Sequence, residues 1–163
     1  MSLTQSNRIK TVRKALSDGL EALTGKTVYM ALDNKAPFPE GSFILLNVIG
    51  QTRQATNRVE NRVTTAIFYR DESVLSELSV QIDCYGNDSQ DVCNAVEMLS
   101  RSTQLIDYGV LPIYAGSPKQ LPFEDAHNLM LERWSIDLTI QYNNTFTSVA
   151  DKIDTAIIPI TTI

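Results

Sequence analysis

The chain has 163 residues, of which 43% are apolar and 20% are charged, and its formal net charge is −5. This length suits one domain, or one domain with an extension, and the composition is that of a globular protein. The acidic balance disfavours sequence-specific nucleic-acid binding, because neutralising phosphates requires a surplus of lysine and arginine.

The chain also lacks the sequence signs of secretion or membrane insertion. Residues 1–14 are polar and basic, and no apolar run approaches the roughly 18 residues of a membrane helix. Cys84 and Cys93 alone do not form the pattern of a disulfide framework. We therefore expect folding in a cytoplasm, with both thiols free and buried.

A helix is the first predicted element. Its apolar stripe recurs at helical spacing and consists of Ile9, Val12, Leu16, Leu20 and Leu23. Ser6 or Asn7 can cap its start, and Gly25 suits the left-handed residue that follows a helix.

Extended segments follow this helix. Apolar and β-branched residues predict strands at 26–32, 42–50, 63–69 and 74–84, and the last of these alternates between apolar and polar residues. Residues 33–41 contain two prolines and form a predicted loop. The polar segment Gln51–Arg62 is predicted to be a loop or the exposed end of a hairpin.

A second helix is predicted directly after the alternating strand, with Asp88 or Ser89 as its cap. Its buried stripe consists of Val92, Ala95, Val96 and Leu99. Residues 109–115 are predicted to form an edge strand, because Pro112 cannot donate to a ladder. A loop at 116–127 leads to a last alternating strand, whose pattern fades at Asn143.

This order of elements predicts an α+β fold, with an antiparallel or mixed β-sheet and two main helices packed on one face. Two helices cannot cover both faces of such a sheet, so the other face is expected to stay available for water or a partner. We expect a single α+β domain at residues 1–143 and a C-terminal extension at residues 144–163.

The sequence offers no recognisable constellation for catalysis. His127 is the single histidine and lies in a predicted loop, and the chain has neither clustered metal ligands nor a glycine-rich phosphate loop. We therefore predict no catalytic residues, no metal and no cofactor. Two alternatives stay open: a small-ligand-binding module in a cleft between sheet and helices, and a metal-dependent hydrolase that uses Asp71, Asp83 or Asp137.

Three segments resemble the neck and tail terminator proteins of tailed bacteriophages. The most specific is LPIYAGSPKQLPFEDAHNLMLERWSIDLTIQYN at 111–143, in which a short strand, a Y-A-x-x-P-x-Q-L-P loop and a long strand containing E-R-W follow in order. VQIDCYGNDSQD at 80–91 and FILLNVIGQTRQATN at 43–57 are also similar to that family. Together the three segments cover most of residues 43–143, whereas the first helix and the tail match only in type.

The resemblance implies a non-enzymatic subunit of a homo-oligomeric ring, six-fold by expectation, that caps the tail tube. Such a ring binds the tail tube protein and the head-completion or connector proteins, sits at the tail and neck of the virion, and is assembled in the host bacterial cytoplasm. Its lumen can pass DNA without sequence-specific binding. A related connector, such as a tail-completion or head-closure adaptor, is the alternative within this class, and the gene can belong to a phage or a prophage.

Two segments are predicted to make contacts between subunits or with partners. The polar segment presents Arg53, Arg58 and Arg62, which can donate charge-assisted hydrogen bonds. The tail is apolar and β-prone, and exposed stretches of this kind pair with another strand or surface; it includes Ile157, Ile158 and Ile160. Docking of the tail on its own subunit is slightly favoured, because an intramolecular contact avoids the entropy of association.

Overall fold

The computed structural model describes residues 3–5, 8–31, 39–64, 67–121, 123–124 and 130–150. The helices in these ranges are α1 (Arg8–Thr24), α2 (Ser89–Ser100) and the 3-10 helix η1 (Gln104–Tyr108). The strands are β1 (Leu3–Gln5), β2 (Val28–Met30), β3 (Phe43–Arg53), β4 (Arg58–Thr64), β5 (Ile67–Tyr85), β6 (Leu111–Ala115), β7 (Lys119–Gln120), β8 (Phe123–Glu124), β9 (Met130–Leu131) and β10 (Arg133–Ala150).

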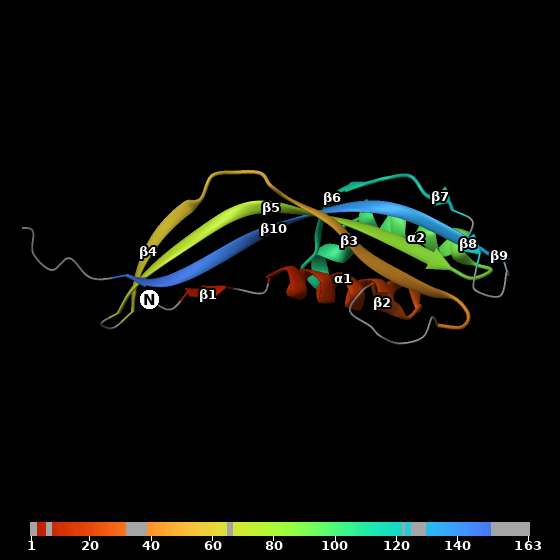
Figure 1. Ribbon diagram of the computed structural model, residues 1–163, viewed down its shortest axis with the longest axis horizontal. Coiled ribbons are helices and arrows are strands. Elements are labelled where there is room, and N and C mark those ends of the chain that lie inside the picture. The colour runs from red at the N-terminus through yellow and green to blue at the C-terminus, as the bar shows by residue number, and fades with distance from the viewer. Residues whose placement is uncertain are drawn as a thin grey trace, which may run out of the picture.

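Two long antiparallel strands, β5 and β10, form the spine of the molecule. They pair without interruption from Arg133 opposite Tyr85 to Ala150 opposite Phe68. Strands β3 and β4 lie end to end along the other edge of β5, while β7, β6 and β1 follow one another along the other edge of β10 (Figure 1). Strand β2 is parallel to β3, so the sheet is mixed and the predicted α+β class is confirmed.

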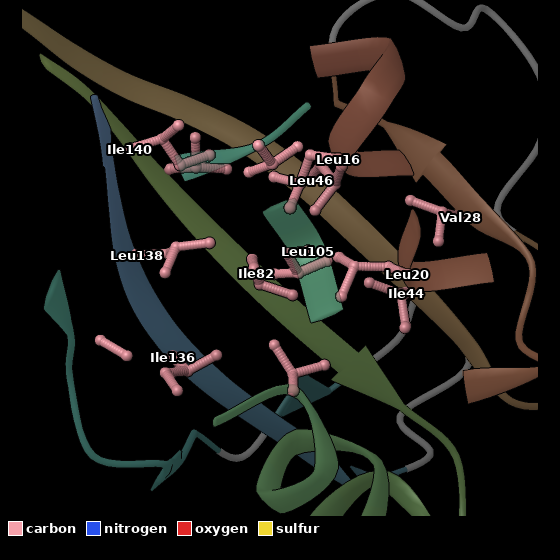
Figure 2. Close-up of a cluster of buried hydrophobic side chains, with 14 of the residues drawn as sticks. Leu16, Leu20, Val28, Ile44, Leu46, Ile82, Leu105, Ile136, Leu138 and Ile140 are labelled. Atoms are coloured by element: carbon pink, nitrogen blue, oxygen red, sulfur yellow. The ribbon is translucent and has the colours of Figure 1, made fainter. Parts of the chain in front are cut away.

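One face of the sheet carries the hydrophobic core, and we call it the helix-covered face. Leu16 and Leu20 of α1 are fully buried and point with Leu105 of η1 toward the sheet (Figure 2). The sheet contributes the alternating residues Leu78, Val80 and Ile82 of β5 and Ile136, Leu138 and Ile140 of β10. The alternating residues of the strands pack against the apolar stripe of the helix and form one continuous core, as the sequence pattern predicts.

The ends of the two main helices differ in how they are stabilised. Gly25 adopts the expected left-handed conformation, with φ of 67°, and its amide donates to the carbonyl of Glu21 at 2.9 Å. Asp88 occupies the N-cap position of α2 but makes no side-chain capping bond, contrary to the predicted cap. Its carboxylate accepts a hydrogen bond from Lys26 Nζ instead, because the turn at Gly25 brings that lysine alongside.

The segment between β3 and β5 differs from its prediction in two ways. Gln51–Arg62, predicted to be a loop or the exposed end of a hairpin, is not one loop, because β3 runs on to Arg53 and β4 begins at Arg58 and pairs with β5 as an antiparallel hairpin. The predicted strand at 63–69 instead contains a chain reversal, since Thr64 pairs with Ile67. Residues between them carry no glycine, asparagine or proline, so the usual turn signal is missing from the sequence.

The last strand is longer than its alternation predicts. β10 continues from Arg133 to Ala150, well past Asn143, where the alternation fades. Alternation is expected where one face is buried, and Tyr142 is the last residue of β10 that is buried among those described. Toward its C-terminal end the strand leaves the region covered by the helices (Figure 1). The expected boundary between residues 143 and 144 therefore falls inside a strand.

Candidate interaction surfaces

The sheet extends beyond the helices as a projecting arm. We define the arm as β4, β1, residues 67–75 of β5 and residues 143–150 of β10 (Figure 1). At the usual rise per strand residue, residues 67–75 span about 30 Å. A sheet of this kind normally buries one apolar face, so an arm without helices leaves apolar side chains in water.

Apolar side chains are exposed on both faces of the arm. Val59 and Val63 of β4 lie opposite Glu72 and Phe68 of β5, which places them on the continuation of the helix-covered face. Val149 lies opposite Tyr69, on the other face of the sheet, which we call the open face. Val63 is 57% exposed and Val149 48% exposed. Since β4 pairs only with β5 among the described strands, its outer edge also presents unpaired backbone groups.

The three arginines predicted as contact residues lie on or beside the arm. Arg58 pairs with Glu60 at 2.6 Å, and Arg62 pairs with Asp71 at 3.2 Å while its guanidinium lies 4.8 Å from the centre of the Tyr69 ring. Within the described ranges, Arg53 at the end of β3 donates to neutral oxygens, those of Ala55 and Asn57. The structure therefore gathers all three arginines at one end of the molecule.

Asp71 is the best-anchored charge of the arm. Its carboxylate accepts a hydrogen bond of 2.6 Å from Thr147 and one of 3.2 Å from Arg62. These two hydrogen bonds, that of Thr147 first, lower the pKa of Asp71 from its ordinary value. The arm is thus held in shape by bonds between β4, β5 and β10.

A second exposed apolar surface lies at the opposite edge of the sheet, along β6. We call it the β6 patch, and its members are Leu111, Ile113 and Tyr114. Tyr114 is 63% exposed and Ile113, the extra residue of a bulge against β10, is 46% exposed. Sequence reasoning missed this patch, although three large apolar residues in one proline-containing edge strand were a visible signal.

A polar cavity of about 450 Å³ opens beside Tyr114 on the open face. Lys119, Ser135 and Asp137 contribute to its lining. Asp137 is exposed and has no ion-pair partner within the described part of the chain. The lining thus combines one cationic and one anionic side chain.

The open face was predicted to be polar, and this holds only in part. Phe43 stacks on Tyr85 with 4.7 Å between ring centroids, and Arg133 lies over the same Tyr85. Arg133 donates a 2.8 Å hydrogen bond to Asp83, whose side chain is only 4% exposed. A cross-strand ion pair and a ring stack therefore cover this end of the face, which alternation alone could not reveal.

The geometry gives little support to the two alternatives, a small-ligand-binding module and a metal-dependent hydrolase. Asp83 and Asp137 lie on the body, whereas Asp71 is on the arm, about 40 Å from Asp83 at the rise of a strand. Across the described residues, no group of three or more His, Cys, Asp or Glu side chains could hold a metal, and both thiols are free and buried. No helix in that part of the chain could cross a membrane. His127, Ile157, Ile158 and Ile160 lie outside the described residues.

These surfaces define a small α+β subunit with a projecting β-arm and exposed apolar residues at two opposite sheet edges. Comparison with protein families identifies the class: the model of the phage neck terminator proteins matches residues 9–163. The chain belongs to the phage neck terminator family. The predicted resemblance is therefore confirmed, and it extends over the first helix and the tail.

A solved structure is similar in fold. It is the sheath/tube terminator of an extracellular contractile injection system, PVC, in its extended state. The identity is 12%, the TM-score is 0.59, and the match covers 95% of this chain and 62% of the other. The chain thus spans about three fifths of the length of that terminator, and at this identity the likeness concerns the fold. No curated protein sequence matches the chain.

Proposed function

We propose that the protein caps the tail tube of a phage as a homo-oligomeric ring, six-fold by expectation, and joins the tube to head-completion proteins at the neck. The observation that carries this proposal is the match to neck terminator proteins over residues 9–163. The similar fold of a protein described as a sheath/tube terminator supports it.

The shape of the subunit suits such a role. A ring subunit must contact two neighbours and also the tube, so it needs more exposed adhesive surface than a monomer. The arm, the β6 patch and the uncovered sheet face provide separate surfaces for these contacts. The net charge of −5 suits a lumen through which DNA passes without adhering.

The proposed role is structural and not catalytic. Assembly of a ring needs no reaction, and Asp71 on the arm and Asp83 on the open face are both engaged in bonds that hold neighbouring strands together. On this proposal the protein is assembled in the bacterial cytoplasm and resides in the neck of the virion.

The proposal is tested by mixing the full-length protein with purified tail tubes of its own phage or prophage. Electron microscopy is expected to show additional density at one end of each tube and none along its wall. An Asp18→Asn variant, at an exposed ion pair of α1 with Lys14, serves as a folded control for non-specific charge binding. Tubes whose two ends stay bare at high protein concentration would refute the tube-capping role.

A further inference from the structure

The two exposed apolar edges of the sheet lie on opposite sides of the subunit. On the β5 side the outermost strand of the arm is β4, and on the β10 side an outermost strand of the body is β6. A closed ring is built from head-to-tail contacts, in which one patch of a subunit meets a different patch of the next. Two unlike adhesive edges at opposite sides provide this arrangement.

The two edges are also complementary in charge. Arg58 projects from β4 with 77% of its side chain exposed, and Glu60 holds it through a surface ion pair, which contributes little. The receiving side offers Asp107 of η1 and Asp137 beside the cavity next to Tyr114, and neither has an ion-pair partner among the described residues. Arg58 of one copy can therefore find a carboxylate on another.

From these observations we infer that the β4 edge of the arm in one copy docks on the β6 patch of the next copy, with Val63 in contact with the surface around Ile113. The inference rests on the proposed ring and assigns its subunit interface. Burial of Val59 and Val63 against Ile113 and Tyr114 supplies the apolar contact, and Arg58 at the start of β4 sets the orientation.

Two charge substitutions test the inference in the full-length chain. Val63→Asp blocks the arm edge but keeps the β6 patch, while Ile113→Asp blocks the patch but keeps the arm. Each substitution buries an unpaired carboxylate at the contact and is expected to weaken self-association by on the order of tenfold or more. Val149→Asp, on the same arm but on the opposite face and two strands from β4, is the matched control and is expected to leave association unchanged.

Mixing the two blocked variants separates a head-to-tail contact from a symmetric one. The mixture retains one functional pair of edges, so native mass spectrometry and sedimentation are expected to show a heterodimer and nothing larger. The double variant is expected to remain monomeric. When the intact chain associates in solution, a mixture that gives no heterodimer, or single variants that associate like the intact chain, overturns the inference.

Cross-linking tests the same interface when the chain forms its ring only on the tail tube. Val63→Cys and Ile113→Cys variants are mixed, bound to tail tubes and treated with a short bismaleimide; Cys84 and Cys93 are fully buried and do not compete. Cross-linked pairs that contain one of each variant support the interface, and their absence both alone and on tubes overturns it. If the Val63→Asp variant caps tubes as well as the intact chain does, the proposed interface is refuted but the terminator role is not. If rings form that require both edges but never bind tubes, the terminator role is refuted but the interface is not.

Discussion

Gly86 lies close against Ser42, and its substitution by alanine is expected to destabilise the fold strongly. It follows β5 and has φ of 106°, outside the left-handed well that other residues tolerate. A Cβ added there would lie 2.3 Å from Ser42 Oγ and 2.8 Å from Ser42 Cα. Ser42 precedes β3, whose first residue is locked in register with Tyr85, so the backbone has little freedom to move away.

The magnitude follows from two contributions. Placing alanine at a positive φ costs about 1–2 kcal/mol, and forcing a methyl group into occupied space costs about 1–3 kcal/mol. We therefore expect Gly86→Ala to lower the free energy of unfolding by about 3 kcal/mol, and the thermal midpoint by about 6–12 °C for a domain of this size. Chemical denaturation and differential scanning calorimetry measure both quantities.

Two further variants test whether the close approach of Gly86 to Ser42 causes the loss of stability. Gly25 also has a positive φ, of 67°, but a Cβ there would meet nothing within 4 Å, so Gly25→Ala is expected to cost about 1 kcal/mol. Ser42→Gly removes two of the three close atoms and is expected to recover part of the Gly86→Ala loss in a double-mutant cycle. If Gly86→Ala costs no more than Gly25→Ala, or if Ser42→Gly gives no recovery, the close approach is not the cause.

Four other outcomes are expected. Leu20→Ala, in the fully buried stripe of α1, is expected to cost about 2–5 kcal/mol in urea denaturation, and a loss below about 1 kcal/mol would contradict the core assignment. Asp83→Ala leaves the Arg133 guanidinium without its partner and is expected to cost about 3 kcal/mol, near the lower end for a buried pair because Arg133 keeps 22% of its side chain exposed. The hydrogen bond from Lys26 lowers the pKa of Asp88, so ionised Asp88 stabilises the folded state above about pH 4. This stabilisation is lost as the pH falls through the lowered pKa, and a Lys26→Met variant is therefore expected to lose less stability between about pH 5 and pH 3 than the intact chain does. Removal of residues 151–163 leaves the β10 ladder intact and is expected to lower the thermal midpoint by a few degrees, whereas an unchanged midpoint with lost tube capping would assign the tail to a neighbouring molecule.

The covered half of the fold was predictable from the sequence, because burial leaves a periodic record. Leu16 and Leu20 repeat at helical spacing, and Leu78 to Cys84 alternates at strand spacing, since each element has one face in the core. The same reasoning placed α2 and the first part of β10. Each of these elements lies where a helix covers the sheet.

The arm was not predictable in the same way. Both of its faces are open to solvent, so residues 58–64 and 143–150 carry no clear alternation, and the chain reversal after Thr64 lacks the usual turn residues. The arginines of the contact prediction were recognisable as a polar group, but their position on an edge strand depends on pairing with β5. The β6 patch needs the whole sheet to be known, because exposure at an edge is a tertiary property.

The ability of the protein to end a tail tube can be measured by polymerising the purified tube protein with the full-length chain added at increasing ratios. Shorter tubes are expected at higher ratios, each closed at one end by a ring whose subunits cryo-electron microscopy can count, with six expected. Tubes of the same length at every ratio, with no ring at either end, would show that the protein does not terminate tubes.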